Sequence, residues 1–276
     1  QKRGYKIYYF EPENLSFLNG KVLAFCKHIK INENKKKFYS RLRTVKFNLE
    51  KSKVILIRND PPFNNRYLYT TFLLNHISNK VKIINHPFAI RNISEKLFSI
   101  NLMRYMPPTL VSENLLEIKS FFKKHKAVVT KPINGFSGNN VILMKKFNSI
   151  KIRKLLKTNN HLFFQKFLPG VSKGDKRVFI IKGKIVGAIS RVPKKGSILS
   201  NMSKGAKAKL TKLTSKEVNA SKAIGKLLLK NNIYFAGIDF VQGKLIGDIN
   251  VTSPTGLAAY KNLSGINLAK LFWDNI

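Results

Sequence analysis

The sequence predicts an α/β half followed by an α+β half, with the boundary near residue 95. Before that point, short apolar runs flank a helical stretch, whereas two-residue turns between longer apolar strands dominate after it. Hydrophobic residues make up 43% of the 276 residues, enough for the core of one large domain or two modest ones. We expect a ligand site between the two halves.

The first half contains four regular elements by its apolar pattern. Strands are predicted at residues 5–10, 54–57 and 81–84, and a helix at residues 67–78. A parallel sheet with crossover helices is the natural packing for such an alternation.

The second half opens with two predicted helices. One begins at Asn92, where Glu95 three residues later has the spacing of a capping box. Another covers residues 112–126, and a strand at residues 127–131 follows it.

Two hairpins and a helix complete the second half. Lys182-Gly183 and Gln242-Gly243 each separate two apolar runs, as two-residue hairpin turns do. Between the hairpins lies a helical stretch in which Thr214 is the expected N-cap and Glu217 completes a capping box.

The charge of the chain is strongly unbalanced. There are 52 basic and 13 acidic residues, a formal net charge of +39. Such a balance suggests a nucleic acid or an anionic membrane as partner. The lysines, however, are spread over the whole chain with abundant Asn, Ile and Phe, all encoded by AT-rich codons, so compositional drift is the preferred explanation. We therefore expect no nucleic-acid partner, and no apolar run approaches the roughly 20 residues of a membrane span. The single cysteine, Cys26, suits a reducing cytoplasm.

The last hairpin carries three oxygen-bearing side chains. Pairing across its turn sets Asp239 opposite Ile246 and Gly237 opposite Asp248, so that Asp239, Asp248 and Asn250 share one face. The opposite face is apolar and is expected to cover the core. Carboxylate and amide oxygens suit Mg²⁺, while the competing interpretation is a solvated sheet face with two ordinary acids.

Lysines and glycines supply candidate phosphate contacts. Gly135 and Gly138 lie in a loop after a strand, where backbone N–H groups can close on a phosphate, or simply form a turn. Lys131 ends the buried-looking strand. Lys96 lies in the first turn of its predicted helix, where its positive charge opposes the helix dipole and an anionic partner would offset that repulsion. Asp175 and Arg177 are further candidates for contacts to the ribose or the phosphates.

Six segments together resemble bacterial glutathione synthetases in order and spacing, over nearly the whole chain. RNDPPF and DINVTSP are their most specific parts. The segments are LIRNDPPFNNRYLYTTFLL, NISEKLFSINL, VVTKPINGFSG, FFQKFLPGVSKGDKRVFIIKGKIV, ISRVP and GIDFVQGKLIGDINVTSPT.

This resemblance implies the ATP-grasp fold, in which two α+β lobes hold ATP. Residues 1–95 would form a pre-ATP-grasp substrate domain and residues 96–276 the ATP-grasp domain, with a lid subdomain at about 110–185. The family's reaction phosphorylates a carboxylate of γ-glutamylcysteine with ATP, and glycine then displaces phosphate to give glutathione. Mg²⁺, or Mn²⁺ in its place, a cytoplasmic location and a homo-oligomer are implied as well.

The resemblance also assigns roles to individual residues. Nucleotide contacts would come from Lys96, Lys131, Gly135, Gly138, Gln165, Phe167, Leu168 and Asp175. Catalytic contacts would come from Arg177, Arg191 and Asn201. The magnesium ligands would be Asp239, Asp248 and Asn250, and Asp239→Asn is expected to abolish phosphate release while leaving the fold intact.

The chain departs from the family pattern at four places. Asp248 stands where the family usually has Glu, Leu199 where it has Arg, and Ala258-Ala259 where it has an Arg-Glu pair near the peptide substrate. The chain also begins where the family already has its first strand and most of a helix, so the first half is expected to be N-terminally truncated. Two alternatives therefore stay open: a related ligase with another acid or amine, and a non-catalytic basic relative.

Overall fold

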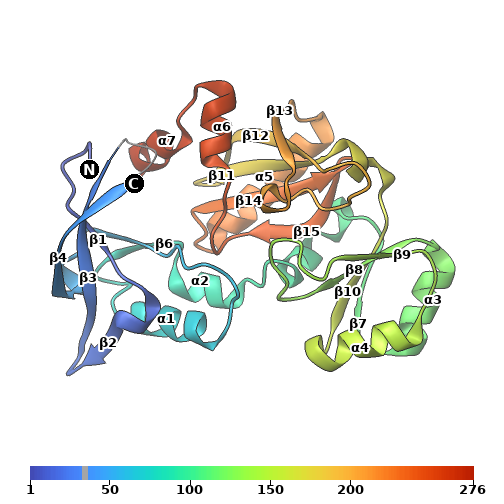
Figure 1. The fold of residues 1–276 in the computed structure, drawn as a ribbon, viewed down its shortest axis with the longest axis horizontal. Helices are drawn as coiled ribbons and strands as arrows, with labels where there is room; N and C mark the ends of the chain where they lie inside the picture. The colour runs from blue at the N-terminus through green and yellow to red at the C-terminus, as the bar shows by residue number, and fades with distance from the viewer. Residues whose placement is uncertain (33–36) are drawn as a thin grey trace. The chain divides into compact units, whose positions relative to one another are not determined.

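The computed structural model describes residues 1–32 and 37–276, which divide into two compact units (Figure 1). Unit 1 covers Gln1–Arg91 and unit 2 covers Asn92–Ile276. Among the described residues, no helix has both the length and the apolar character that crossing a membrane requires.

Unit 1 is built on a four-stranded antiparallel sheet that the sequence patterns did not reveal. Long strands β3 (Lys21–Ile31) and β4 (Tyr39–Asn48) pair with each other, and the other edge of β3 pairs with β1 (Ile7–Tyr9) and β2 (Leu15–Leu18). We expected only one strand in this region. Most of β4 is exposed, so it lacks the apolar run by which buried strands are recognised.

The remainder of unit 1 follows the predicted α/β pattern. Strands β5 (Val54–Leu56) and β6 (Lys82–Ile84) are parallel, and α1 (Asn65–Asn75) lies between them in the chain. Short 3-10 turns, η1 (Pro12–Asn14) and η2 (Leu49–Lys51), and helix α2 (Pro87–Asn92) complete the unit. The predicted parallel sheet thus consists of this one pair.

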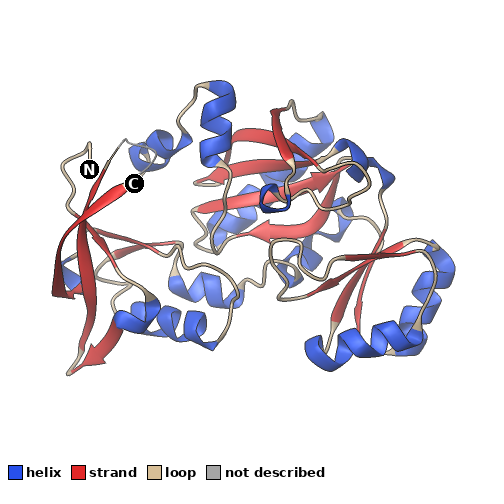
Figure 2. Ribbon diagram, viewed as in Figure 1, coloured by secondary structure: helices blue, strands red, loops and turns tan. Residues whose placement is uncertain are grey.

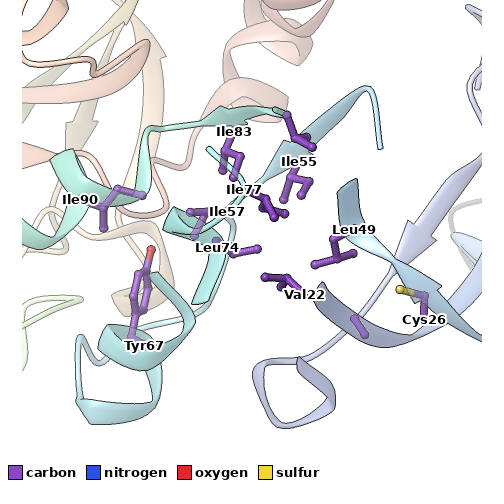
Figure 3. Packing of buried hydrophobic residues seen from close by; sticks show 12 residues of the cluster. Val22, Cys26, Leu49, Ile55, Ile57, Tyr67, Leu74, Ile77, Ile83 and Ile90 are labelled. Atoms are coloured by element: carbon purple, nitrogen blue, oxygen red, sulfur yellow. The ribbon is translucent and has the colours of Figure 1, made fainter. Parts of the chain in front are cut away.

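One apolar core joins the elements of unit 1 (Figure 3). Val22 and Cys26 of β3 pack in the same cluster as Ile55 of β5, Leu74 of α1 and Ile83 of β6. Cys26 is fully buried, and this burial raises the pKa of its thiol to about 11.

The predicted helix beginning at Asn92 is wrong. Asn92 instead ends α2, and the next helical segment is the 3-10 helix η3 (Leu97–Tyr105). No capping box forms, because the Glu95 carboxylate accepts hydrogen bonds from Val251 and Thr252, far along the chain.

Unit 2 begins with a four-stranded antiparallel sheet of order β7-β10-β8-β9. Its strands are β7 (Thr109–Ser112), β8 (Val128–Pro132), β9 (Ile142–Met144) and β10 (Leu162–Lys166). Helices α3 (Leu115–His125) and α4 (Ser149–Asn159) cover this sheet (Figure 2). Their buried faces, with Ile118, Phe122 and Ile152, share a core with Phe164 of β10. The cap of α3 is Asn114, two residues later than the predicted start at 112.

A five-stranded antiparallel sheet of order β13-β12-β11-β14-β15 follows. Its strands are β11 (Asp175–Ile181), β12 (Lys184–Val192), β13 (Lys207–Leu210), β14 (Phe235–Val241) and β15 (Lys244–Asn250). Both predicted hairpins are confirmed, since Lys182-Gly183 and Gln242-Gly243 have positive φ angles, as type I′ turns require. Helix α5 (Ser215–Lys230) carries the predicted Thr214–Glu217 capping box. The chain ends with α6 (Leu257–Ser264) and α7 (Leu268–Asp274), and 3-10 turns η4 (Pro169–Lys173) and η5 (Met202–Lys204) lie in loops.

The register of the last hairpin is right near its turn and wrong beyond it. Val241 pairs with Lys244 as predicted, but an irregularity shifts the register, so that Gly237 lies opposite Asn250 rather than Asp248. The shift is of two residues, which leaves every side chain on its predicted face.

Candidate active site

Two lysines of unit 2 meet at one carboxylate. The Lys96 Nζ lies 3.7 Å from Asp248 Oδ1, and the Lys131 Nζ lies 3.5 Å from Asp248 Oδ2. Each ammonium is also held by backbone carbonyls: Lys96 donates to Gly135 at 2.5 Å and Lys131 donates to Ile246 at 2.7 Å. Both lysines are buried, so their charges are fixed in place and poorly solvated.

This environment perturbs Lys131. Burial lowers the pKa of its ammonium group, Asp248 opposes that effect, and the nearby charge of Lys96 lowers the pKa further. An additional anion at this position would therefore relieve an electrostatic cost that the protein itself only partly compensates.

A second charge cluster spans three neighbouring strands. Arg177 of β11 lies directly opposite Asp239 of β14, and Asp175 lies directly opposite Arg191 of β12. Arg177 binds Asp239 through two hydrogen bonds of 2.8 and 2.7 Å. Arg191 binds Asp175 through both Nε and Nη2, and its Nη2 also lies 2.9 Å from Asp239 Oδ2. All four side chains are buried, so cross-strand pairing assembles a dry network of alternating charges.

The network acts differently on its two carboxyls. Burial raises the pKa of Asp239, but the charges of Arg177 and Arg191 outweigh it and hold the pKa well below its usual range. For Asp175, burial dominates over the single close partner Arg191, and the pKa is raised. Burial also works against the charge of Arg191, yet Asp239 and Asp175 together raise its pKa.

The oxygen atoms of Asp239, Asp248 and Asn250 fit a hard divalent cation. The Asn250 Nδ2 donates to the Gly237 carbonyl at 3.1 Å and lies 3.3 Å from Asp239 Oδ2, which leaves its Oδ1 as an acceptor. Asp239 Oδ1 accepts from Arg177 Nε alone among the described residues, so lone-pair capacity remains there. Across residues 1–32 and 37–276, no group of three or more His, Cys, Asp or Glu side chains could hold a metal ion. A site for such an ion on this hairpin would draw on the Asn250 amide oxygen as well as the two carboxylates.

The glycine loop of unit 2 lies against a second loop. Gly138 has a φ of +73°, and a Cβ atom there would stand 2.6 Å from Asn201 Oδ1 and 3.1 Å from Leu199 Cδ2. Only glycine satisfies both constraints. The Gly135 N–H donates to the Pro132 carbonyl, so in this conformation it closes a turn rather than facing a ligand.

The end of β10 offers backbone groups. The Gln165 side chain is buried and donates to Thr109 Oγ1 at 3.1 Å, while the Phe167 N–H donates to Ala127. Within the described part of the chain, the Phe167 carbonyl and the Leu168 N–H have no hydrogen-bond partner. This carbonyl and this N–H belong to one trans peptide group and point to opposite sides, so they do not face a single ligand edge together.

Comparisons with known proteins place this arrangement in a family. The family model described as prokaryotic glutathione synthetase, ATP-grasp domain, matches residues 95–265, and the corresponding N-terminal domain model matches residues 1–91. The chain belongs to the prokaryotic glutathione synthetase family.

Curated members of the prokaryotic glutathione synthetase family match over the full chain. The glutathione synthetases of Mesorhizobium japonicum and Bradyrhizobium diazoefficiens are each 35% identical over 100% of this chain and 89% of their own length. A solved ATP-grasp ligase from Chryseobacterium gregarium, associated with a ribosomally made peptide, covers 100% of this chain and 87% of its own. It has a TM-score of 0.60 and 18% identity, so it supports the fold alone. The predicted ATP-grasp fold is confirmed, and the chain is an ATP-dependent ligase.

The structure thus groups most of the sequence-predicted residues of this glutathione synthetase family member. Lys96, Lys131 and Asp248 meet in one contact set, and the two arginines join Asp175 and Asp239 in another. Asn201 lies beside Gly138 in the loop pair. The interpretation of Asp239 as part of a solvated sheet face is wrong, since only 3% of it is exposed.

Sequence reasoning overlooked one residue at this site, Glu95. It immediately precedes Lys96 and binds the end of β15, yet its position three residues after Asn92 suggested a local cap. The sequence offered one sign of its importance: Glu95 is next to Lys96 in a chain that has only 13 acidic residues.

Proposed function

We propose that this family member joins γ-glutamylcysteine to glycine at the expense of ATP, giving glutathione, ADP and phosphate. The match of both glutathione synthetase domain models along the chain is the observation that carries the proposal. The buried cations of unit 2 supply a chemical basis for it, because four of them surround three carboxylates and leave a net positive site for a polyphosphate.

In the first step, an oxygen of the cysteinyl carboxylate of γ-glutamylcysteine attacks the γ-phosphorus of ATP and the bond to ADP breaks. Lys96 and Lys131 would bind the phosphates, since their ammonium groups are already positioned by backbone carbonyls. Such pre-positioned charges stabilise the transferred phosphoryl group without reorganising when the reaction occurs. The backbone of the segment at Phe167 and Leu168 would contact the adenine.

In the second step, the amine of glycine attacks the acyl carbon, phosphate leaves, and the amine loses a proton. Arg191 and Arg177 would stabilise the charge on the departing phosphate. The loop pair of Gly138 and Asn201 would exclude water, which otherwise hydrolyses the acyl phosphate. We assign this loop to a lid subdomain at about residues 110–185, within an ATP-grasp domain of residues 96–276 that follows a substrate domain of residues 1–95.

Asp239, Asp248 and Asn250 would hold Mg²⁺, or Mn²⁺, through their free oxygen atoms. Such an ion, when bound, neutralises negative charge on the phosphates. Lys96 and Lys131 lie beside Asp248 and would also hold its carboxylate in place.

A second candidate function is ligation of a different acid or amine. Leu199 stands where the family has an arginine, and its side chain packs beside Gly138. Ala259, in the place of a family acid, packs in an apolar cluster with Phe179 and Tyr260. An apolar side chain cannot replace the bidentate hydrogen bonds by which arginine recognises a carboxylate.

Phosphate release separates the two candidates. The chain is incubated with ATP, Mg²⁺, γ-glutamylcysteine and glycine, and with each substrate omitted in turn. We expect release only when both substrates are present. No release with both, but ADP formation with another acid and amine, would establish the second candidate instead.

Cellular context follows from the same proposal. A ligase that consumes ATP and a thiol dipeptide fits the cytoplasm, with small molecules as its partners. A homo-oligomer and the lack of a nucleic-acid partner stay predictions, which sedimentation and salt-dependent binding measurements test.

A further inference from the structure

Glu95 links the segment that carries Lys96 to the strand that carries the candidate metal ligands. Its Oε1 accepts three hydrogen bonds: from the Val251 N–H at 2.9 Å, the Thr252 N–H at 3.1 Å and the Thr252 Oγ1 at 2.8 Å. Its backbone carbonyl accepts from the Ile249 N–H at 3.1 Å. One residue therefore holds the chain on both sides of Asn250.

These contacts are stronger than ordinary loop contacts. A carboxylate that accepts from two successive backbone N–H groups resembles an anion in a backbone nest, and hydrogen bonds to an ionised acceptor are roughly twice as strong as neutral ones. Ile249 and Val251 are both buried, so their N–H groups would be costly to leave without acceptors. The geometry of residues 249–252 thus depends on a side chain that lies more than 150 residues earlier in the sequence.

The adjacent residue extends this link to Asp248. Lys96 follows Glu95 directly, and its Nζ reaches Asp248 Oδ1 at 3.7 Å. Lys96 thus contacts residue 248, and Glu95 contacts residues 249, 251 and 252. Together these contacts lie at or on both sides of Asp248 and Asn250. The Asp248 and Asn250 side chains are each only partly buried, and beyond these contacts Asp248 is held by Lys131 and Asn250 by the Gly237 carbonyl.

We propose that Glu95 is a positioning residue for divalent-cation binding. It fixes the backbone of residues 249–252, and through it the oxygen atoms of Asp248 and Asn250. This inference rests on the proposed metal-dependent use of ATP, and it adds a residue that touches neither the ion nor the nucleotide.

The test measures Mn²⁺ binding by electron paramagnetic resonance in the presence of ADP, which needs no peptide substrate. We expect Glu95→Ala to weaken Mn²⁺ binding at least tenfold. Glu95→Gln keeps an acceptor oxygen but loses the charge, so it should restore most of the affinity. Thr252→Val removes only the hydroxyl donor and should weaken binding about twofold to threefold. Glu113→Ala is the matched control and should change nothing, because this glutamate of unit 2 is exposed and its one ion-pair partner among the described residues is His161, at 4.0 Å.

Binding of ADP without metal distinguishes positioning from a general structural role. The Lys96 ammonium is held independently by Gly135, so metal-free ADP affinity of Glu95→Ala should stay within about twofold of the original. Equal loss of metal-free ADP and Mn²⁺ affinity would overturn the proposal, as would unchanged Mn²⁺ affinity in Glu95→Ala. If the unaltered chain binds Mn²⁺ with ADP but releases no phosphate with γ-glutamylcysteine and glycine, the proposed function fails while this inference stands.

Discussion

Asp239 and Asp248 lie on the same face of one hairpin but in opposite kinds of environment. Asp239 is 3% exposed, and both its oxygens bind guanidinium groups at 2.7 to 2.9 Å. The Asp248 side chain is 28% exposed, and its lysine neighbours lie at 3.5 and 3.7 Å. The first carboxylate is thus part of the framework of the sheet, while the second is the more available to a ligand. Identical residue types on one face need not contribute equally to stability and to binding.

The largest effect is expected from Asp239→Asn. This change leaves Arg177 and Arg191 buried with one carboxylate fewer between them, which costs about 3–5 kcal/mol in comparable buried pairs. Contrary to the sequence-based expectation, the fold should therefore be weakened as well as phosphate release abolished. Urea unfolding followed by circular dichroism measures the loss, with Glu113→Gln as the exposed control. Unfolding at the original urea concentration would show that the arginines do not depend on Asp239.

Asp248→Asn should separate activity from stability. Lys96 and Lys131 keep their hydrogen bonds to backbone carbonyls, so the free energy of unfolding should fall by only about 1 kcal/mol. Phosphate release, in contrast, should fall by about 100-fold, since a charged oxygen ligand is lost. A stability loss equal to that of Asp239→Asn would contradict the contrast between the two carboxylates.

Asp248→Glu tests the same contrast through an expected improvement in metal binding. The longer side chain extends the carboxylate by one methylene toward the ligand. The Mg²⁺ concentration for half-maximal phosphate release should fall on the order of threefold, with the KM for ATP little changed. A raised Mg²⁺ requirement would indicate that the surrounding lysines are adapted to aspartate.

The smallest effect concerns pH. Burial and Lys96 lower the pKa of Lys131, so as the pH rises toward the ordinary lysine value this ammonium deprotonates before an exposed one does. Bound phosphate favours the charged form, so ADP binding should take up protons above the lowered pKa and weaken as the pH rises. Calorimetry in two buffers of different ionisation enthalpy measures this uptake, and Lys131→Arg should remove it. Proton release on binding by the unaltered chain would contradict the sign.

Local patterns predicted those parts of the fold that depend on neighbouring residues. The turns at Lys182-Gly183 and Gln242-Gly243 and the Thr214–Glu217 cap are each fixed within a few residues, and all three were predicted. The two-residue register shift before Ile249 depends on how β15 meets other segments, so turn pairing alone could not reveal it.

Contacts at long range account for the other failures. Glu95 has the spacing of a helix cap, but its carboxylate accepts hydrogen bonds from the backbone of Val251 and Thr252 instead. The resemblance had already singled out Asp175, Arg177 and Arg191. That they form one charge network could not be predicted without knowing that β11 pairs with both β12 and β14. Their roles toward ATP and metal stay predictions.

The burial of Cys26 has a redox consequence. Burial raises the pKa of the Cys26 thiol to about 11, so the protonated form dominates at neutral pH, and the side chain is fully enclosed. Thiol–disulfide exchange requires an accessible thiolate. A protein that handles γ-glutamylcysteine and glutathione would meet both their thiols and their oxidised forms, and this sulfur atom is protected from forming mixed disulfides with either.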